Sequence, residues 1–86
     1  MTLENRTNAY EVTFKHSFEL KGVGERLSAG TYVIEEEEAP LPLSSVIGFR
    51  RIATTIRVPT SMGISHHAID HADLERALKR DAAARG

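Results

Sequence analysis

Hydrophobic and polar residues alternate regularly over residues 10–21. His16 is the only polar member of the apolar set, which otherwise consists of Tyr10, Val12, Phe14, Phe18 and Leu20. A period of two places one face of a strand against a core and the other face in water. We therefore predict a strand over residues 10–21. Residues 1–9 are polar and lack periodicity, and we expect them to form a flexible N-terminal arm.

Two later segments also predict strands. The β-branched and aromatic residues Thr31–Ile34 favour a strand that continues into Glu35 and Glu36. We expect this strand to end before Pro40 and Pro42, because proline has no N–H to donate to the ladder.

Alternation resumes over residues 48–59 and predicts a third strand. Turn residues at positions 59–63 separate it from residues 64–68, which would form a short fourth strand. Residues 44–47 fit either a short helical turn or a loop.

The C-terminal segment carries the signals of a capped helix. Asp70 is a suitable N-cap, and Ile69 and Leu74 occupy the two positions of a hydrophobic staple around it. Asp73 stands where a capping box has Glu or Gln, so the box is imperfect. Residues at helical spacing form a narrow apolar stripe: Leu74, Ala77, Leu78 and Ala82.

These elements predict an α+β fold, a small antiparallel β-sheet of three to four strands with one C-terminal α-helix packed on it. Glu75 and Lys79 are spaced to add an i,i+4 ion pair to that helix.

We expect a single domain over residues 10–86, because 86 residues allow one modest core and no internal repeat is visible. A core of this size is only marginally stable, so formation of a homodimer would supplement it.

Composition narrows the classes of function. The chain has no cysteine, which excludes disulfides, thiolate metal sites and thiol nucleophiles and fits a reducing compartment. Its net charge of -1 provides no overall attraction to nucleic acid or to an anionic membrane. No apolar run approaches the roughly 20 residues of a membrane-spanning helix, and no secretory signal is visible after Met1. We expect a soluble, cytoplasmic protein.

Four short blocks of sequence follow the order of these elements. They are Gly30-Thr31-Tyr32, Glu35-Glu36-Glu37-Glu38, Phe49-Arg50-Arg51-Ile52-Ala53-Thr54 and Ile69-Asp70-x-x-Asp73-Leu74-Glu75-x-Ala77-Leu78. In these blocks, over residues 14–81, the chain resembles a set of small bacterial proteins of rhizobia and related alphaproteobacteria. The resemblance implies the same order of elements and a bacterial cytoplasmic origin. It implies no activity, because none is assigned to those proteins.

The histidines are the first candidates for a site. His66, His67 and His71 lie near Asp70 and Asp73, and imidazoles together with carboxylates bind first-row metals. Adjacent strand residues point to opposite faces, so His66 and His67 do not converge. We therefore expect polar residues around a helix start here rather than a metal site.

The second group of candidates is the acidic run Glu35–Glu38 with the arginines Arg50, Arg51 and Arg57. Carboxylates favour hard cations, and arginines suit phosphates. Successive strand residues alternate between faces, however, so at most two of the carboxylates converge. The favoured interpretation is that the two segments are neighbouring antiparallel strands, whose opposite charges face each other and help to set the register.

Motifs for catalysis are missing from the chain. Gly22-Val23-Gly24 lacks the third glycine of a dinucleotide fingerprint, there is no P-loop, and no serine stands in a GxSxG elbow. We expect His16 to be a satisfied core or edge residue. We therefore predict no catalytic, cofactor-binding or metal-binding residues and no enzyme activity.

Two functions stay open. The first is a non-enzymatic protein-protein interaction or regulatory module that self-associates, since a small open sheet leaves strand edges, above all that of the first strand, for another chain. The alternative is an antitoxin-like nucleic-acid-binding regulator that contacts phosphates through Arg50, Arg51 and Arg57 or through the basic C-terminal helix. The candidate interaction surface consists of Arg50, Arg51, Arg57, His66 and His67.

Overall fold

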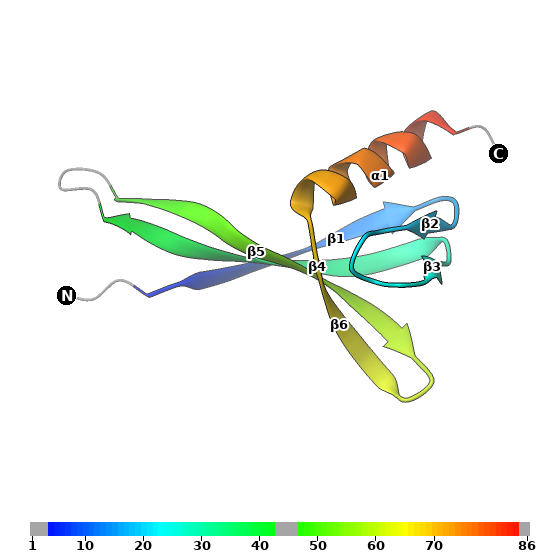
Figure 1. Cartoon of the computed structure of the whole chain (residues 1–86), viewed down its shortest axis with the longest axis horizontal. Coiled ribbons are helices and arrows are strands. Elements are labelled where there is room, and N and C mark those ends of the chain that lie inside the picture. Colours follow the sequence, from blue (N-terminus) through cyan, green and yellow to red (C-terminus); the bar gives the residue numbers. More distant parts are fainter. Residues whose placement is uncertain (1–3, 43–46, 85–86) are drawn as a thin grey trace.

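A computed structural model describes residues 4–42 and 47–84 of the chain. Within them the fold is α+β, as predicted, with a four-stranded antiparallel sheet, a second sheet of two short strands and a C-terminal helix (Figure 1). The large sheet has the strand order β1-β4-β5-β6, and β2 pairs with β3. The elements are β1 (Arg6–Phe14), β2 (Phe18–Glu19), β3 (Arg26–Leu27), β4 (Gly30–Pro42), β5 (Ile47–Thr60), β6 (Gly63–Ile69) and α1 (His71–Ala83).

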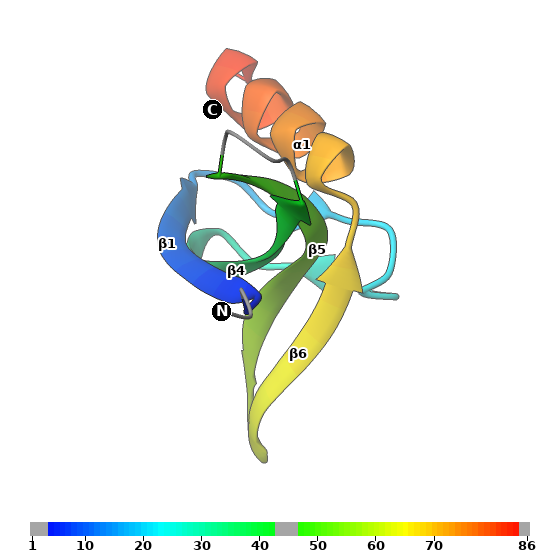
Figure 2. The same cartoon turned by 90° about the vertical axis from the view of Figure 1, so that its left-hand side faces the viewer.

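The core lies on one face of the large sheet, which we call the core face, and α1 runs along the same side (Figure 2). Directly paired residues of antiparallel strands share a face, so Ile34 and Ile56, which are both fully buried, meet at its centre. Phe14 stacks on Phe18 with ring centroids 3.5 Å apart, and Tyr32 meets both rings edge-on. The alternating apolar residues identified in the sequence therefore form this face.

The strand predicted for residues 10–21 is interrupted. β1 ends at Phe14, and the chain turns through residues 15–17 before β2 begins at Phe18. The turn is stabilised from outside the sheet, because Asp81 of α1 accepts hydrogen bonds from the backbone N–H groups of Lys15 and His16, both at 2.9 Å. The two bonds join residues that are 66 and 65 positions apart in the sequence, so a local sequence pattern does not reveal them.

β1 also begins earlier than the pattern predicted. Residues 6–9, expected in a flexible arm, lie in β1 and pair with residues 35–38 of β4. Side-chain contacts accompany this pairing: Arg6 Nε donates to Glu38 Oε1 at 2.9 Å, and the Asn8 amide donates to the same oxygen. Both faces of the strand are polar here, so no hydrophobic alternation marks it in the sequence.

The prediction that the second strand ends before Pro40 is wrong, because β4 continues to Pro42. Pairing with β1 stops at Glu38, so beyond this residue β4 has β5 on one side and no described strand on the other. A proline is tolerated at such an edge, where its nitrogen can face the unpaired side. The strands predicted at residues 48–59 and 64–68 are confirmed as β5 and β6. Of residues 44–47, for which a short helical turn and a loop were both open, Ile47 begins β5, and residues 44–46 lie outside the described residues.

α1 begins where predicted, after the N-cap Asp70, whose Oδ1 accepts from the N–H of Ala72 at 3.0 Å. Of the predicted apolar stripe, Leu74 and Ala77 are buried, Leu78 packs partly buried against the core and Ala82 is exposed. The predicted partner of Glu75 is wrong: this carboxylate contacts the His71 ring, one turn earlier, rather than Lys79.

Two carboxylates fasten α1 to the segments on either side of β2. Asp73 is buried, and its Oδ2 accepts from the Lys21 N–H at 3.0 Å rather than completing a capping box. Two turns later, Asp81 accepts from Lys15 and His16, whose Nδ1 also lies 3.1 Å from Asp81 Oδ1. His16 was expected to be a satisfied core or edge residue; its hydrogen bonds are satisfied, but it lies in the turn after β1 rather than in the core or on a strand edge.

The Asp81 contacts predict a loss of stability in acid. The N–H of Lys15, with a further contribution from His16, lowers the pKa of Asp81 below its ordinary value of 3.8. The ionised form therefore favours the fold, and its contribution is complete above the ordinary value and lost as the pH falls through the lowered pKa. Between about pH 6 and about pH 2, the free energy of unfolding measured with urea should fall more steeply for the wild type than for D81N. Equal slopes would contradict the assignment.

The large sheet extends well beyond its core. We call the projecting part, residues 6–9, 36–42 and 47–53, the finger; it points away from α1 and the small sheet (Figure 1). Every residue of the described core cluster lies outside it. The Cα radius of gyration is 15.4 Å, whereas a compact domain of this length has about 12 Å. The finger is therefore a strand extension without a hydrophobic core of its own.

Candidate interaction surface

The five residues proposed from the sequence as an interaction surface do not form one surface. The register places Arg51, opposite Glu38, and His67, opposite Ile56, on the core face. Arg50, Arg57 and His66 lie on the opposite face of the sheet. Strand alternation separates the two sets, as it must for neighbouring residues.

The predicted pairing of the acidic run with the arginines is confirmed between β4 and β5. Arg57 donates to both carboxylate oxygens of Glu35 at 3.0 Å, and this bidentate contact lowers the pKa of Glu35 and raises that of Arg57. Arg51 lies 3.4 Å from Glu36. These arginines therefore hold the register of the two strands, as the charge pattern indicated.

Glu36 of β4 is surrounded by polar groups from β1, β5 and α1 at the point where the core face changes from apolar to polar. Thr54 of β5 donates to its Oε1 at 3.3 Å, and His71 Nδ1 of α1 lies 2.8 Å from the same oxygen. Burial, and then the neighbouring Glu36 carboxylate with its hydrogen bond, raise the pKa of Tyr10 on β1. With Arg51 as a further contact, this carboxylate is satisfied, so the cluster fastens the start of α1 to the sheet.

The histidines are dispersed, as the sequence predicted for His66 and His67. His71 stands apart from both, between Glu36 and Glu75. Over residues 4–42 and 47–84, no group of three or more histidine, aspartate or glutamate side chains is arranged to hold a metal ion. α1 has 13 residues, and no helix in the described part of the chain is long and apolar enough to span a membrane.

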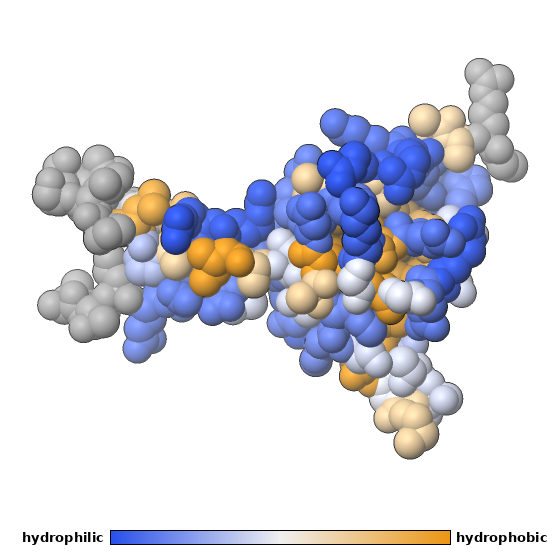
Figure 3. Space-filling model, viewed as in Figure 1, coloured by the Kyte–Doolittle hydropathy of each residue, from blue (hydrophilic) through white to orange (hydrophobic). Residues whose placement is uncertain are grey.

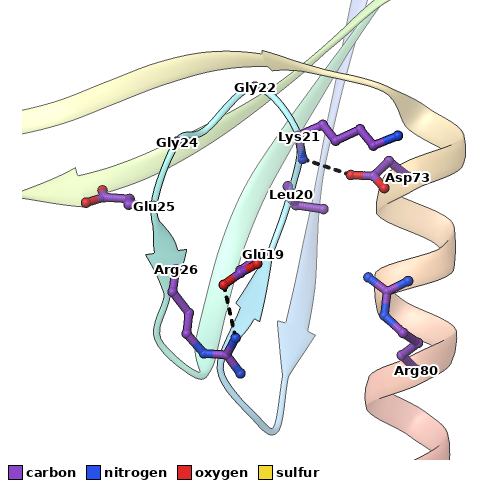
Figure 4. A pocket seen from close by; sticks show the side chains of 9 residues that line it. All are labelled: Glu19, Leu20, Lys21, Gly22, Gly24, Glu25, Arg26, Asp73 and Arg80. Carbon is purple, nitrogen blue, oxygen red and sulfur yellow. Dashed lines mark hydrogen bonds and ion pairs between the residues drawn. The ribbon is translucent and has the colours of Figure 1, made fainter.

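An open groove of about 650 Å³ lies between α1 and the loop that joins β2 to β3 (Figure 4). Arg26 lies 3.3 Å from Glu19, and the Asp73 carboxylate accepts from the Lys21 backbone N–H. Arg80 extends toward it from α1. Positive and negative side chains alternate along the groove, so its charge favours no single class of ligand.

The strand edges of the large sheet are more informative. Its described edges are those of β1, of β4 beyond Glu38, of β5 over residues 47–53 and of β6, and the last three carry features that hinder strand addition. Beyond Glu38, β4 carries Pro40 and Pro42. Beside them, residues 47–53 of β5 carry two arginines and a bulge, since Ile52 is the extra residue between the pairs Glu37–Ala53 and Glu38–Arg51. Prolines, charges and bulges are the usual means by which proteins prevent association at open edges.

The edge of β6, the outer strand on the side opposite β1, is covered near its end. Gly22 has φ +94° and packs so closely on Ala68 that a Cβ at this position would overlap the Ala68 carbonyl oxygen. The loop after β2 therefore covers the end of β6. Covering an edge with a loop has the same protective effect as a charge or a proline.

β1 is the exception. It is the outer strand next to β4, and no other described strand pairs with its free edge along the nine residues from Arg6 to Phe14 (Figure 2). The strand contains neither proline nor a bulge, and of its two charged residues Arg6 is bound to Glu38 whereas Glu11 is exposed. Tyr10, at its centre, is 37% exposed, although it is a large aromatic residue. Nothing in the described structure blocks the addition of another strand here.

The sequence had indicated the edge of the first strand, but it missed the first four of the nine residues of β1. Residues 6–9 carry a weak alternation of Arg6 and Asn8 with Thr7 and Ala9, in which neither set is strongly apolar. The signal that could have identified them is electrostatic, since Arg6 complements the acidic run in β4. Arg6 also covers the Phe49 ring, with its guanidinium carbon 3.7 Å from the ring centroid.

Comparisons with known proteins provide no relative: no protein-family model matches the chain, and no curated protein or solved structure is significantly similar to it.

Proposed function

We propose that this protein is a non-enzymatic interaction module that binds an extended segment of another protein chain as an additional strand on the outer edge of β1. The observation that supports the proposal is the contrast between the edges. Pro40, Pro42 and the β5 bulge protect the edges of β4 and β5 in the finger and the Gly22 loop covers the end of β6, whereas the nine-residue edge of β1 is left free. Strand addition uses backbone hydrogen bonds for affinity and side chains on alternate positions for specificity.

The finger supports the same proposal. Its outer strand, residues 6–9, has β4 on one side only, and the finger contributes nothing to the core cluster. Figure 3 shows hydrophobic side chains on the finger among polar ones, and Ile52 is 45% exposed. A narrow sheet without a core is only marginally stable in water. A further strand along β1 would widen the three-stranded part of the finger, which contains residues 6–9.

Nucleic-acid binding stays the alternative prediction. Two of its three strand arginines, Arg51 and Arg57, already contact Glu36 and Glu35. A phosphate would have to displace these carboxylates. The absence of enzyme activity, the cytoplasmic location and the bacterial origin likewise stay predictions.

Strand addition on β1 predicts a specific footprint of protection. Random extended peptides of about 12 residues, displayed and selected against the protein, should yield binders that slow hydrogen exchange of the outward-facing amides of β1. The amides of β6, the other outer strand, are the internal control and should be unaffected. At concentrations where the chain is monomeric, failure to select any peptide, or protection of β6 or α1 in place of β1, would refute the proposal.

A further inference from the structure

The β1 edge is self-complementary, as the sequence of this strand shows. When two copies of β1 pair antiparallel about a two-fold axis normal to the sheet, the core faces stay on one side and only residues of equal parity meet. Full overlap of Arg6–Phe14 with itself places Tyr10 on the axis, opposite its own copy. The remaining pairs are Arg6 with Phe14, Thr7 with Thr13, Asn8 with Val12 and Ala9 with Glu11.

No like charges face each other in this register. The Tyr10 pair and the two threonine pairs are types of cross-strand contact that stabilise antiparallel sheets. The alternative register centred on Glu11 would oppose two carboxylates and shorten the overlap. The register of greatest overlap is thus also free of electrostatic conflict.

The exposed surface area of the chain is large enough for an interface between two copies. The chain exposes 6136 Å², whereas a compact monomer of 9.5 kDa exposes about 5,000 Å². The excess, about 1,100 Å², is comparable with the roughly 800 Å² that each partner contributes to a stable interface. In the antiparallel arrangement, residues 6–9 of each finger lie beside residues 11–14 of the other copy, which belong to the compact body.

We propose that a second copy of this chain occupies the β1 edge, with β1 paired antiparallel to its copy about a two-fold axis at Tyr10, so that the two large sheets form one sheet of eight strands. The inference rests on the proposed function and names the partner. The dimer would cover the edge of β1 with the same edge of a second molecule, which closes the assembly about the two-fold axis.

Two charge variants test the register. T7K/T13K places lysine opposite lysine at both threonine pairs, whereas T7K/T13E, changed at the same two exposed positions, places lysine opposite glutamate. In sedimentation equilibrium the first should weaken dimerisation about tenfold or more, and the second should bind at least as tightly as the wild type. Equal dissociation constants for the two variants would overturn the register. Both changes remove the same Thr13–Thr31 contact of 2.9 Å, so they are matched in their effect on the monomer.

Cysteine cross-linking provides an independent test, because the chain has no cysteine of its own. Residues opposite each other in an antiparallel pair have Cα atoms about 4.5–5.5 Å apart, within the range of a disulfide. Oxidation of Y10C at micromolar concentration should therefore yield a covalent dimer at least about tenfold faster than M62C, whose parent side chain is 95% exposed at the β5–β6 turn. Equal cross-linking rates would place the interface elsewhere.

The outcomes separate the inference from the proposed function. A chain that stays monomeric up to about 100 µM but binds selected peptides on β1 overturns the second copy as occupant and leaves strand addition standing. A monomer that binds no peptide overturns both. A dimer that ignores the charge of residues 7 and 13 and forms no Y10C disulfide refutes the β1 interface.

Discussion

Replacing Phe14 with alanine should lower the free energy of unfolding by about 3–5 kcal/mol. Phe14 is only 1% exposed, stacks on Phe18 and meets Tyr32 edge-on, so its removal leaves a cavity and breaks the aromatic group at the centre of the core. Small domains have only about 5–15 kcal/mol in total. The variant should thus be close to the limit of folding, which urea denaturation followed by circular dichroism measures.

F49A is the matched control for this prediction, because it removes the same side chain from the finger. Phe49 lies outside the core cluster and has Arg6 over its ring. The loss there should be no more than about 2 kcal/mol, from one exposed cation–π contact and limited apolar burial. All variants are compared at one protein concentration, since association would add to the apparent stability. Equal losses for F14A and F49A would show that the finger has a core of its own.

Replacing Gly22 with alanine should have the second-largest effect, about 2–5 kcal/mol. Two penalties combine: φ is +94°, a conformation that L-residues rarely adopt, and the new Cβ would overlap the Ala68 carbonyl oxygen. That oxygen belongs to the backbone of β6, so it cannot rotate away. The loop would have to withdraw from the edge it covers.

Gly24 separates the two penalties. Its φ is +83°, and a Cβ there would meet nothing within 4 Å. G24A should therefore lose only the conformational part, about 1–2 kcal/mol. Urea unfolding of both variants gives the difference, which is the cost of crowding β6. If G24A is destabilised as much as G22A, crowding against Ala68 contributes nothing to the loss of unfolding free energy in G22A.

Local patterns predicted those parts of the fold that depend on a few neighbouring residues. The parity of Tyr10, Val12 and Phe14 indicated a strand with one buried face, because alternation and burial are coupled by the geometry of the strand itself. Asp70 indicated the start of α1 for the same reason: a cap satisfies backbone groups only two residues away. The charges of Glu35 and Arg57 were interpreted correctly because neighbouring antiparallel strands were already expected.

Features that depend on distant segments were missed or misplaced. The break after Phe14 follows from Asp81, and the strand character of residues 6–9 follows from their pairing with residues 35–38. The continuation of β4 through Pro40 depends on where β1 stops pairing. In each case the deciding partner lies at least 26 positions away, beyond the reach of a periodicity that describes one element at a time.

The sequence by itself determined the class of fold, the cap and inner face of α1, and the alternation of β1, because each of these is a property of one short segment in water. Only the tertiary structure decided which edges are open. Whether an edge is free depends on where every other strand ends and which loop crosses it, as the Gly22 loop crosses β6 and no described segment crosses β1. The free edge of β1, on which both the proposed interaction and the proposed dimer rest, is a consequence of the assembled sheet.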